Sequence, residues 1–175
     1  MDNIKRAEKI SLFVFDVDGT LTDGKIYISS EGEAMKAFHA QDGMAMSVAK
    51  RLGYDIILIS GRKSKILEMR AQELGVIELY QNIERKLELL QDICKKKAIS
   101  LEQVAYAGDD LNDVPMFEKV GLAWAPADAC TDVQKLAHFV SAKGGGQGAV
   151  RELVEFVLGV QGRWVDALNF FKKGE

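Results

Sequence analysis

The sequence contains few cysteines and prolines and no long hydrophobic run. Its two cysteines, Cys94 and Cys130, do not form a CxxC pair, so we expect two reduced thiols in a cytoplasmic protein rather than a disulfide framework. The two prolines and the absence of a low-complexity stretch give no sign of an interdomain linker. No apolar run approaches the roughly 18 residues of a membrane-spanning helix, and residues 1–6 do not lead into a signal-like apolar segment.

An excess of basic residues is also missing. The chain carries 23 Lys and Arg against 26 Asp and Glu, a formal net charge of −3, which argues against a broad nucleic-acid-binding face. Hydrophobic residues make up 47% of the 175 residues, as in globular rather than disordered proteins. We expect one domain over residues 1–160, followed by a C-terminal tail over residues 161–175.

Short apolar runs alternate with helical patterns along the chain. The clearest run covers residues 10–15, and its β-branched and aromatic residues are typical of a strand buried on both faces. Further strands are predicted over residues 55–59, 77–80, 104–107, 121–124 and 138–140, and helices over 44–52, 64–74, 84–97, 113–119 and 148–158. This alternation predicts a doubly wound, Rossmann-like α/β fold, in which helices cover both faces of a parallel sheet.

One segment, at about residues 25–39, breaks the alternation directly after the first strand. It is typical of a β-hairpin, with Ile26 and Ile28 on one face, a turn over residues 29–32 and a return strand over 35–38. The chain offers no room for a cap domain over the site at the strand ends. We therefore expect an open site that a neighbouring subunit closes, with the hairpin and the aromatic tail residues Trp164, Phe170 and Phe171 as candidates for that packing.

Polar and charged side chains follow the predicted strands, where parallel sheets place their ligand sites. Asp16 and Asp18 follow the first strand, Ser60 and Arg62 follow the second, and Gly108–Asp113 follows the fourth. Two carboxylates at positions i and i+2 repel each other when both are charged, and a shared cation or a shared proton relieves the repulsion. An all-oxygen set of this kind suits Mg²⁺.

In type and order, four motifs resemble those of the haloacid dehalogenase phosphatase superfamily. They are DVDGT at Asp16–Thr20, Ser60, Lys86 and GDDLND at Gly108–Asp113. The resemblance implies that Asp16 is the nucleophile that forms an aspartyl phosphate. It implies that Asp18 protonates the leaving alcohol and then deprotonates the attacking water. Mg²⁺ would bind Asp16, the backbone carbonyl of Asp18, and Asp109.

The same resemblance implies supporting roles around these groups. Ser60 and Lys86 would hold the phosphoryl oxygens, over which charge is spread in the transition state. Asp110 and Asp113 would orient Lys86 and metal-bound water. Thr20 would help to fix the side chain of Asp18.

A finer pattern is similar to the capless branch of that superfamily that acts on 3-deoxy-D-manno-octulosonate 8-phosphate. It is carried by DVDGTLTDG at residues 16–24, KAF at 36–38, Asp42-Gly43, SGRK at 60–63, Arg70 and GGQGAVRE at 145–152. The resemblance implies a cytoplasmic phosphatase of lipopolysaccharide precursor synthesis. It also implies a homotetramer with its active sites at subunit interfaces and its hairpins in a central barrel.

Substrate contacts follow from the same resemblance. Arg62 and Arg70 would bind the sugar acid, Arg70 from a neighbouring subunit, because a guanidinium binds a carboxylate through two parallel hydrogen bonds. The loop His39–Gly43, with Asp42, would line the sugar pocket. Asp18, Gly61 and Lys86 would also touch the substrate.

Alternatives remain open at this point. A related branch acts on nine-carbon keto acid phosphates, but an acidic residue commonly stands there in the place of Arg62. A non-catalytic phospho-receiver domain also gathers acids at strand ends, but it carries adjacent acids after its first strand. A scaffold that has lost the chemistry is disfavoured by the intact motifs. Asp42 is equally compatible with capping a helix that starts at Met44 and with facing the substrate.

Overall fold

The computed structural model describes residues 2–172, so residue 1 of the predicted domain and residues 173–175 of the predicted tail lie outside the described part. Its centre is a six-stranded sheet in the order β5-β4-β1-β6-β7-β8. The strands are β1 Leu12–Phe15, β4 Asp55–Ile59, β5 Glu78–Tyr80, β6 Val104–Ala107, β7 Leu122–Ala125 and β8 Phe139–Val140. Neighbouring strands pair in parallel throughout this sheet. The predicted doubly wound α/β fold is confirmed.

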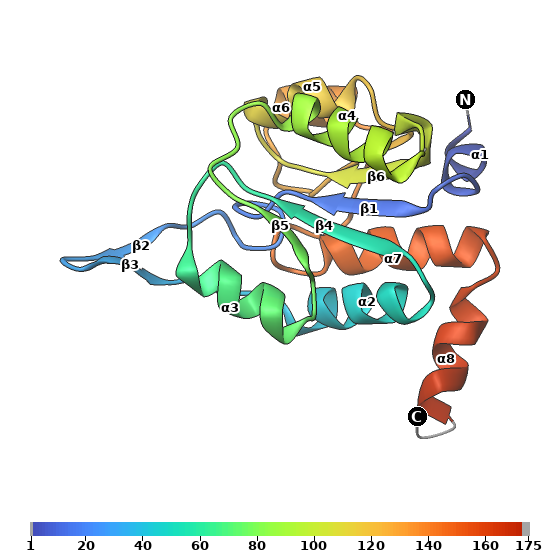
Figure 1. Cartoon of the computed structure of the whole chain (residues 1–175), viewed down its shortest axis with the longest axis horizontal. Helices are drawn as coiled ribbons and strands as arrows, with labels where there is room; N and C mark the ends of the chain where they lie inside the picture. Colours follow the sequence, from blue (N-terminus) through green and yellow to red (C-terminus); the bar gives the residue numbers. More distant parts are fainter. Residues whose placement is uncertain (1, 173–175) are drawn as a thin grey trace.

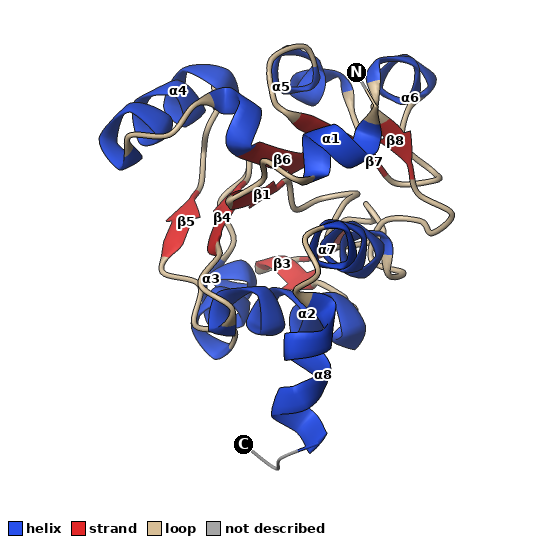
Figure 2. Ribbon diagram, turned by 90° about the vertical axis from the view of Figure 1, so that its right-hand side faces the viewer, coloured by secondary structure: helices blue, strands red, loops and turns tan. Residues whose placement is uncertain are grey.

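Helices cover both faces of the sheet (Figure 1, Figure 2). One layer consists of α2 Ala40–Arg51, α3 Lys65–Glu73 and α7 Ala149–Val160, and the other of α4 Lys86–Lys97, α5 Val114–Phe117 and α6 Thr131–Leu136. The short elements α1 Asn3–Ala7, η1 Leu101–Gln103 and η2 Leu111–Asp113 complete the layers. None of the helices in the described residues is long and apolar enough to cross a membrane.

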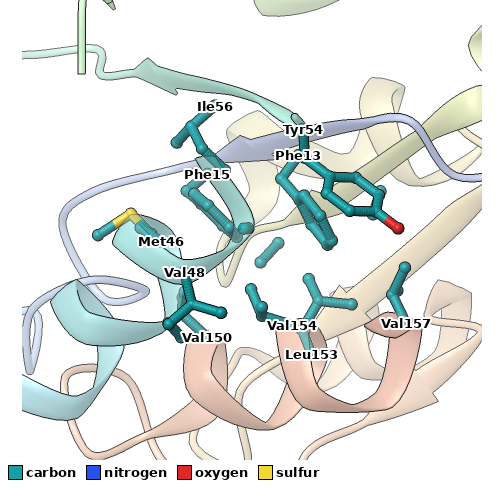
Figure 3. Close-up of a cluster of buried hydrophobic side chains, with 14 of the residues drawn as sticks. Phe13, Phe15, Met46, Val48, Tyr54, Ile56, Val150, Leu153, Val154 and Val157 are labelled. Carbon is teal, nitrogen blue, oxygen red and sulfur yellow. The ribbon is translucent and has the colours of Figure 1, made fainter. Parts of the chain in front are cut away.

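The central strand β1 shows why these residues form a buried strand. Successive side chains point to opposite faces, so a strand covered on both faces must be apolar throughout. Phe13 and Phe15 enter the core against α2 and α7, whereas Leu12 and Val14 enter the core against α4, α5 and α6. Figure 3 shows the first core, where the two phenylalanines meet the valines and leucine of α7. The four strand residues are fully buried, and β1 thereby holds the site at its carboxyl end.

The predicted hairpin forms, but the bounds of its return strand differ from the prediction. It consists of β2 Tyr27–Ser29 and β3 Gly32–Met35, and it projects from the end of the sheet where β1 and β4 finish (Figure 1). The predicted return strand over 35–38 is wrong, because the turn is shorter than expected. Gly32 has a φ of +114°, a conformation that glycine adopts without a steric penalty, so β3 starts at this residue.

The helices also differ from the prediction: α1 and α6 were not predicted, and the bounds of the predicted helices shift by up to four residues. α2 begins at Ala40, four positions before Met44, for a reason that lies in the tertiary contacts of Asp42 described below. The segment predicted as a tail contains α8 Trp164–Lys172, which extends away from the body of the protein (Figure 1). Trp164 and Phe170 pack against the core of their own chain, whereas Phe171 is exposed.

Candidate active site

The parallel sheet brings the predicted site residues to one edge. β1 lies between β4 and β6, so Asp16, Ser60 and Asp109 follow three adjacent strands at their carboxyl ends. Lys86 is the first residue of α4. The sheet therefore gathers groups that are up to 93 positions apart in the chain, as the strand-end argument predicts.

The loop after β1 folds tightly and depends on glycine. The backbone carbonyl of Val17 accepts hydrogen bonds from the amides of Leu21 and Thr22 at 2.9 and 3.0 Å. Gly19 has a φ of +96°, and a Cβ at this position would lie 2.0 Å from Oδ2 of Asp109. Only glycine therefore lets the carboxylate of Asp109 approach the loop, which explains the glycine of the DVDGT motif.

Two supports of this loop were not predicted in these roles. The buried Thr22 hydroxyl donates to the Val17 carbonyl at 3.4 Å and accepts from the Gly19 amide at 3.3 Å. The amide of Gly146 donates to the carbonyl of Thr20 at 3.0 Å, and a Cβ on Gly145 would lie 1.8 Å from the carbonyl oxygen of Gly19. The glycine-rich segment before α7 thus packs directly on the loop after β1, and its sequence signals were the run of glycines and the GGQGAVRE motif at 145–152.

Lys86 binds the predicted nucleophile directly. Its ammonium donates to Oδ1 of Asp16 at 2.5 Å and to Oδ1 of Asp113 at 2.6 Å. The residue is only 2% exposed. Burial alone would lower the pKa of Lys86, but the Asp16 and Asp113 carboxylates outweigh burial and raise it. Lys86 is therefore a fixed positive charge beside Asp16.

Asp113 is the group that orients this lysine. Its Oδ1 also accepts from the Tyr106 hydroxyl at 2.6 Å, and its Oδ2 accepts from the amides of Asp109 and Asp110 at 2.9 and 3.3 Å. Tyr106 is a fully buried partner that sequence reasoning missed. Asp110 is exposed, and its carboxylate accepts from the amide of Leu111 at the start of η2. The structure thus brings Asp113 to Lys86 and turns Asp110 toward η2.

A divalent cation fits the carboxylates at this edge. One carboxylate oxygen each of Asp16, Asp109 and Asp113 lies within 4.8 Å of the others. Burial, followed by the charge of Asp113, raises the pKa of Asp16 well above its ordinary value and raises the pKa of Asp109 to about 7. Because both oxygens of Asp113 already accept protein hydrogen bonds, Asp16 and Asp109 are the side chains best placed to hold the cation.

The Asp18 side chain lies outside that carboxylate group, and its partner was not predicted. The ammonium of Lys36, which follows β3, donates to Oδ1 of Asp18 and lies 3.3 Å from Glu33. Thr20 does not hold Asp18 as the resemblance implied, because its hydroxyl donates to Asp109 at 3.3 Å. A metal contact of Asp18 through its backbone carbonyl remains a prediction.

Ser60 is buried at the end of β4, and its hydroxyl accepts from the amide of Arg62 at 3.1 Å. It does not cap α3, whose N-cap is Ser64 with a bond from the Leu67 amide. Gly61 and Arg62 are exposed at the same strand end. The placement leaves Ser60 and Arg62 available to a ligand at this edge.

Asp42 does not cap its own helix, one of the two roles left open for it, and a contact with the substrate remains a prediction. Its buried carboxylate accepts from the amides of Gly148 and Arg151 at 3.2 and 2.7 Å and so caps α7 rather than its own helix. Burial raises the pKa of Asp42 above its ordinary value. The half-buried ring of His39 lies 3.8 Å from Asp42, at the N-cap position of α2. Asp42 thus joins α2 to α7, which is why α2 starts earlier than predicted.

Arg70 and Gly43 meet at the contact between α2 and α3. A Cβ on Gly43 would lie 2.3 Å from Nη2 of Arg70. The guanidinium lies over the ring of Phe38 at 5.8 Å from its centroid and pairs with Glu73 at 2.8 Å. Within its own chain Arg70 therefore packs between helices, and a contact with the site of a neighbouring subunit remains a prediction.

Comparisons with known proteins agree with this geometry. A family model described as haloacid dehalogenase-like hydrolase matches residues 59–153. The chain is 44% identical over 166 residues to the 3-deoxy-D-manno-octulosonate 8-phosphate phosphatase of Escherichia coli strain K12, a match that covers 95% of this chain and 88% of the relative.

Two crystal structures are similar over almost the whole chain. The 3-deoxy-D-manno-octulosonate 8-phosphate phosphatase of Yersinia pestis superposes with a TM-score of 0.89 at 41% identity, covering 91% of this chain and 86% of that one. The enzyme of the same name from Moraxella catarrhalis, solved with magnesium ion, phosphate ion and KDO, gives a TM-score of 0.92 at 36% identity and covers 96% and 97%. The chain therefore belongs to the haloacid dehalogenase-like hydrolases and, within them, to the 3-deoxy-D-manno-octulosonate 8-phosphate phosphatase family.

Proposed function

We propose that this chain hydrolyses 3-deoxy-D-manno-octulosonate 8-phosphate to the free eight-carbon keto acid and phosphate, with Mg²⁺ as cofactor, in lipopolysaccharide precursor synthesis. The observation that carries the chemistry is the group formed by the buried Asp16 and Lys86 and the partly buried Asp109 at one sheet edge. The relatives named for this activity supply the substrate.

The nucleophile in this proposal is Asp16. Lys86 occupies Oδ1 of Asp16, which leaves Oδ2 to attack phosphorus. The new O–P bond forms as the P–O bond to the sugar breaks, and the leaving alkoxide takes a proton from Asp18. Water then attacks the aspartyl phosphate and gives a proton back to Asp18, which releases phosphate and restores Asp16. Asp16 and Asp18 therefore end the cycle as they began it.

The surrounding residues hold charge during both steps. Lys86 and Ser60 face the end of the sheet where the phosphoryl oxygens would lie, and fixed donors there stabilise the charge of the transition state. Mg²⁺, held by Asp16 and Asp109 with the backbone carbonyl of Asp18, would supply further positive charge that offsets the repulsion between a carboxylate and a phosphate. Asp113 keeps the ammonium of Lys86 directed at Asp16.

The acid end of the substrate needs a cation of its own. Arg62 is exposed two positions after Ser60, and a guanidinium binds a carboxylate through two parallel hydrogen bonds. We assign Arg62 to the sugar acid and the segment around His39 to the sugar pocket. Arg70 would serve the site of a neighbouring subunit.

We also propose that the chain forms a homotetramer in the cytoplasm. The hairpin exposes Ile26, Ile28 and Met35, with exposed fractions of 46%, 74% and 50%. An isolated two-stranded hairpin is marginally stable in water, and exposed apolar side chains gathered on one element favour contact with another copy. Light scattering should give the mass of four chains, and a fully active monomer would contradict this assembly.

Steady-state kinetics with two substrates test the function. The eight-carbon keto acid phosphate should have a higher kcat/KM than a nine-carbon keto acid phosphate. EDTA should abolish phosphate release and added Mg²⁺ should restore it. A higher kcat/KM with the nine-carbon compound would show that this compound is the preferred substrate. Autophosphorylation without turnover would indicate a phospho-receiver.

A further inference from the structure

We propose that Lys36, presented by the hairpin, is a positioning residue for the acid–base carboxyl of Asp18. This inference rests on the proposed phosphatase function. The ammonium of Lys36 donates to Oδ1 of Asp18, so Oδ2 is the oxygen left to exchange a proton with the leaving alcohol and with water. A positioned carboxyl has to lie within hydrogen-bond reach of both.

The burial of the Lys36 side chain shows that the position of its ammonium is fixed. Its side chain is only 4% exposed, against 20% for Asp18. A lysine removed from water in this way is costly unless its charge is paired. Lys36 has two such partners, Asp18 and Glu33. Lys25 at the other end of the hairpin is 71% exposed and pairs only with the nearby Asp23 among the described ion pairs, so burial is not a general property of lysines here.

Glu33 connects this lysine to the body of the domain. Its Oε1 lies 3.3 Å from the Lys36 ammonium, and its Oε2 accepts from the hydroxyl of Ser64. Ser64 is buried and caps α3 by accepting from the Leu67 amide at 3.1 Å. The resulting series of contacts runs from α3 through β3 to Asp18. It fixes Lys36 from a rigid element although the tip of the hairpin is exposed.

The proton path follows from these contacts. In the first step the proton on Oδ2 of Asp18 passes to the leaving oxygen as its bond to phosphorus breaks. In the second step a proton of the attacking water passes to the same Oδ2. Lys36 keeps its three protons throughout and holds Oδ1, so the carboxyl cannot rotate away between the two steps. The hairpin thereby contributes to catalysis within its own chain.

The test uses Lys36→Met, which removes the charge and keeps the length of the side chain. The probes are 4-nitrophenyl phosphate and phenyl phosphate, which lack a carboxylate and differ in how much their leaving group needs a proton. General acid catalysis is worth about 10²–10⁴-fold. We therefore expect kcat/KM to fall at least about tenfold more for phenyl phosphate than for 4-nitrophenyl phosphate. Glu33→Gln should change the ratio in the same direction by a smaller factor, and Lys25→Met should leave it unchanged.

Two outcomes would overturn the role of Lys36. An equal loss with both aryl phosphates would indicate a purely structural residue, and a loss confined to the keto acid phosphate would indicate a substrate contact. If Lys36→Met does not fold, Glu33→Gln decides by the same ratio. Failure of the proposed function itself is distinguishable, because the Asp16→Asn variant would then turn over aryl phosphates as fast as the wild type.

Discussion

The two ends of the central sheet use polar side chains in different ways. At the carboxyl end, charged groups face one another: Lys86 pairs with Asp16 and Asp113, and Lys36 pairs with Asp18. At the amino end, ion pairs such as that of Lys97 with Asp55 are more exposed, and Gln161 satisfies the backbone between α1 and β1. The amide of Gln161 donates to the carbonyls of Ala7 and Ile10 at 2.7 and 2.8 Å. The ion pairs at the carboxyl end leave one oxygen each of Asp16 and Asp18 available for chemistry, whereas the backbone contacts at the amino end serve the fold.

The largest effect is expected for the nucleophile. Asp16→Asn should lower kcat by several orders of magnitude, because an amide cannot form the covalent intermediate. Phosphate release from the eight-carbon substrate measures the loss. The matched control is Asp55→Asn, an exposed carboxylate at the amino end of β4, which should keep its turnover. Near-normal rates in Asp16→Asn would contradict covalent catalysis by Asp16 at the carboxyl end of the sheet.

Lys86→Met should affect both activity and stability. Loss of one fixed donor to a transition-state oxyanion costs about 10²–10³-fold in rate. Removal of the ammonium also leaves buried carboxylates unpaired, which lowers the free energy of unfolding by about 3–5 kcal/mol. Urea denaturation without Mg²⁺ and steady-state kinetics with Mg²⁺ measure the two effects. If stability is unchanged, the lysine is not the buried counter-ion described here.

Gln161→Ala tests the amino end. The change removes the Gln161 donor of the Ile10 carbonyl and leaves the Ala7 carbonyl with the Ile10 amide as its donor. It should lower the free energy of unfolding by about 1–3 kcal/mol, as measured by urea denaturation. The kcat of the folded variant should equal that of the wild type, because the hydrogen bonds described for the Gln161 side chain go to the backbone between α1 and β1 and to the hydroxyl of Tyr54. A marked loss of kcat would show that the two ends of the sheet are coupled.

The smallest effect is a pH dependence at His138. Its Nδ1 accepts from the amide of Ala123 at 2.9 Å, and burial, followed by the charge of Arg6, lowers the pKa of the imidazole from its ordinary 6.5. Below about pH 6.5 the unfolded chain takes up a proton that the folded chain does not, so stability falls as the pH falls. His138→Gln should remove this contribution to the pH dependence of the stability. Thermal unfolding between pH 8 and 5.5 measures it, and identical slopes would exclude the histidine.

Much of the fold could be predicted because its signals are local. The apolar run that contains β1 and the run that forms β4 are short, and each is followed by polar residues, which is sufficient to predict parallel strands and a site at their ends. The helix over α2 was predicted too short because Asp42 and Gly43 are poor helix formers. Their positions are stabilised by contacts with α7 and Arg70, which lie far away in the sequence.

The sequence predicted most of the side chains that form the candidate site, but not which of these side chains contact one another. Thr20 was expected beside Asp18 but binds Asp109. Lys36 and Tyr106 were not recognised as partners of Asp18 and Asp113. Each of the contacts with Asp109 and Asp18 joins different elements, so no spacing along the chain predicts it. A buried lysine and an exposed one look alike in a sequence.

The sequence by itself determined the alternation of strands and helices and the chemical groups at the strand ends, because hydrophobic periodicity and motif spacing depend on neighbouring residues. Only the tertiary structure decided which oxygen of each aspartate is occupied and which remains available. That choice depends on distances between side chains from different elements. Packing of the hairpin, α3 and α7 around the loop after β1 sets those distances.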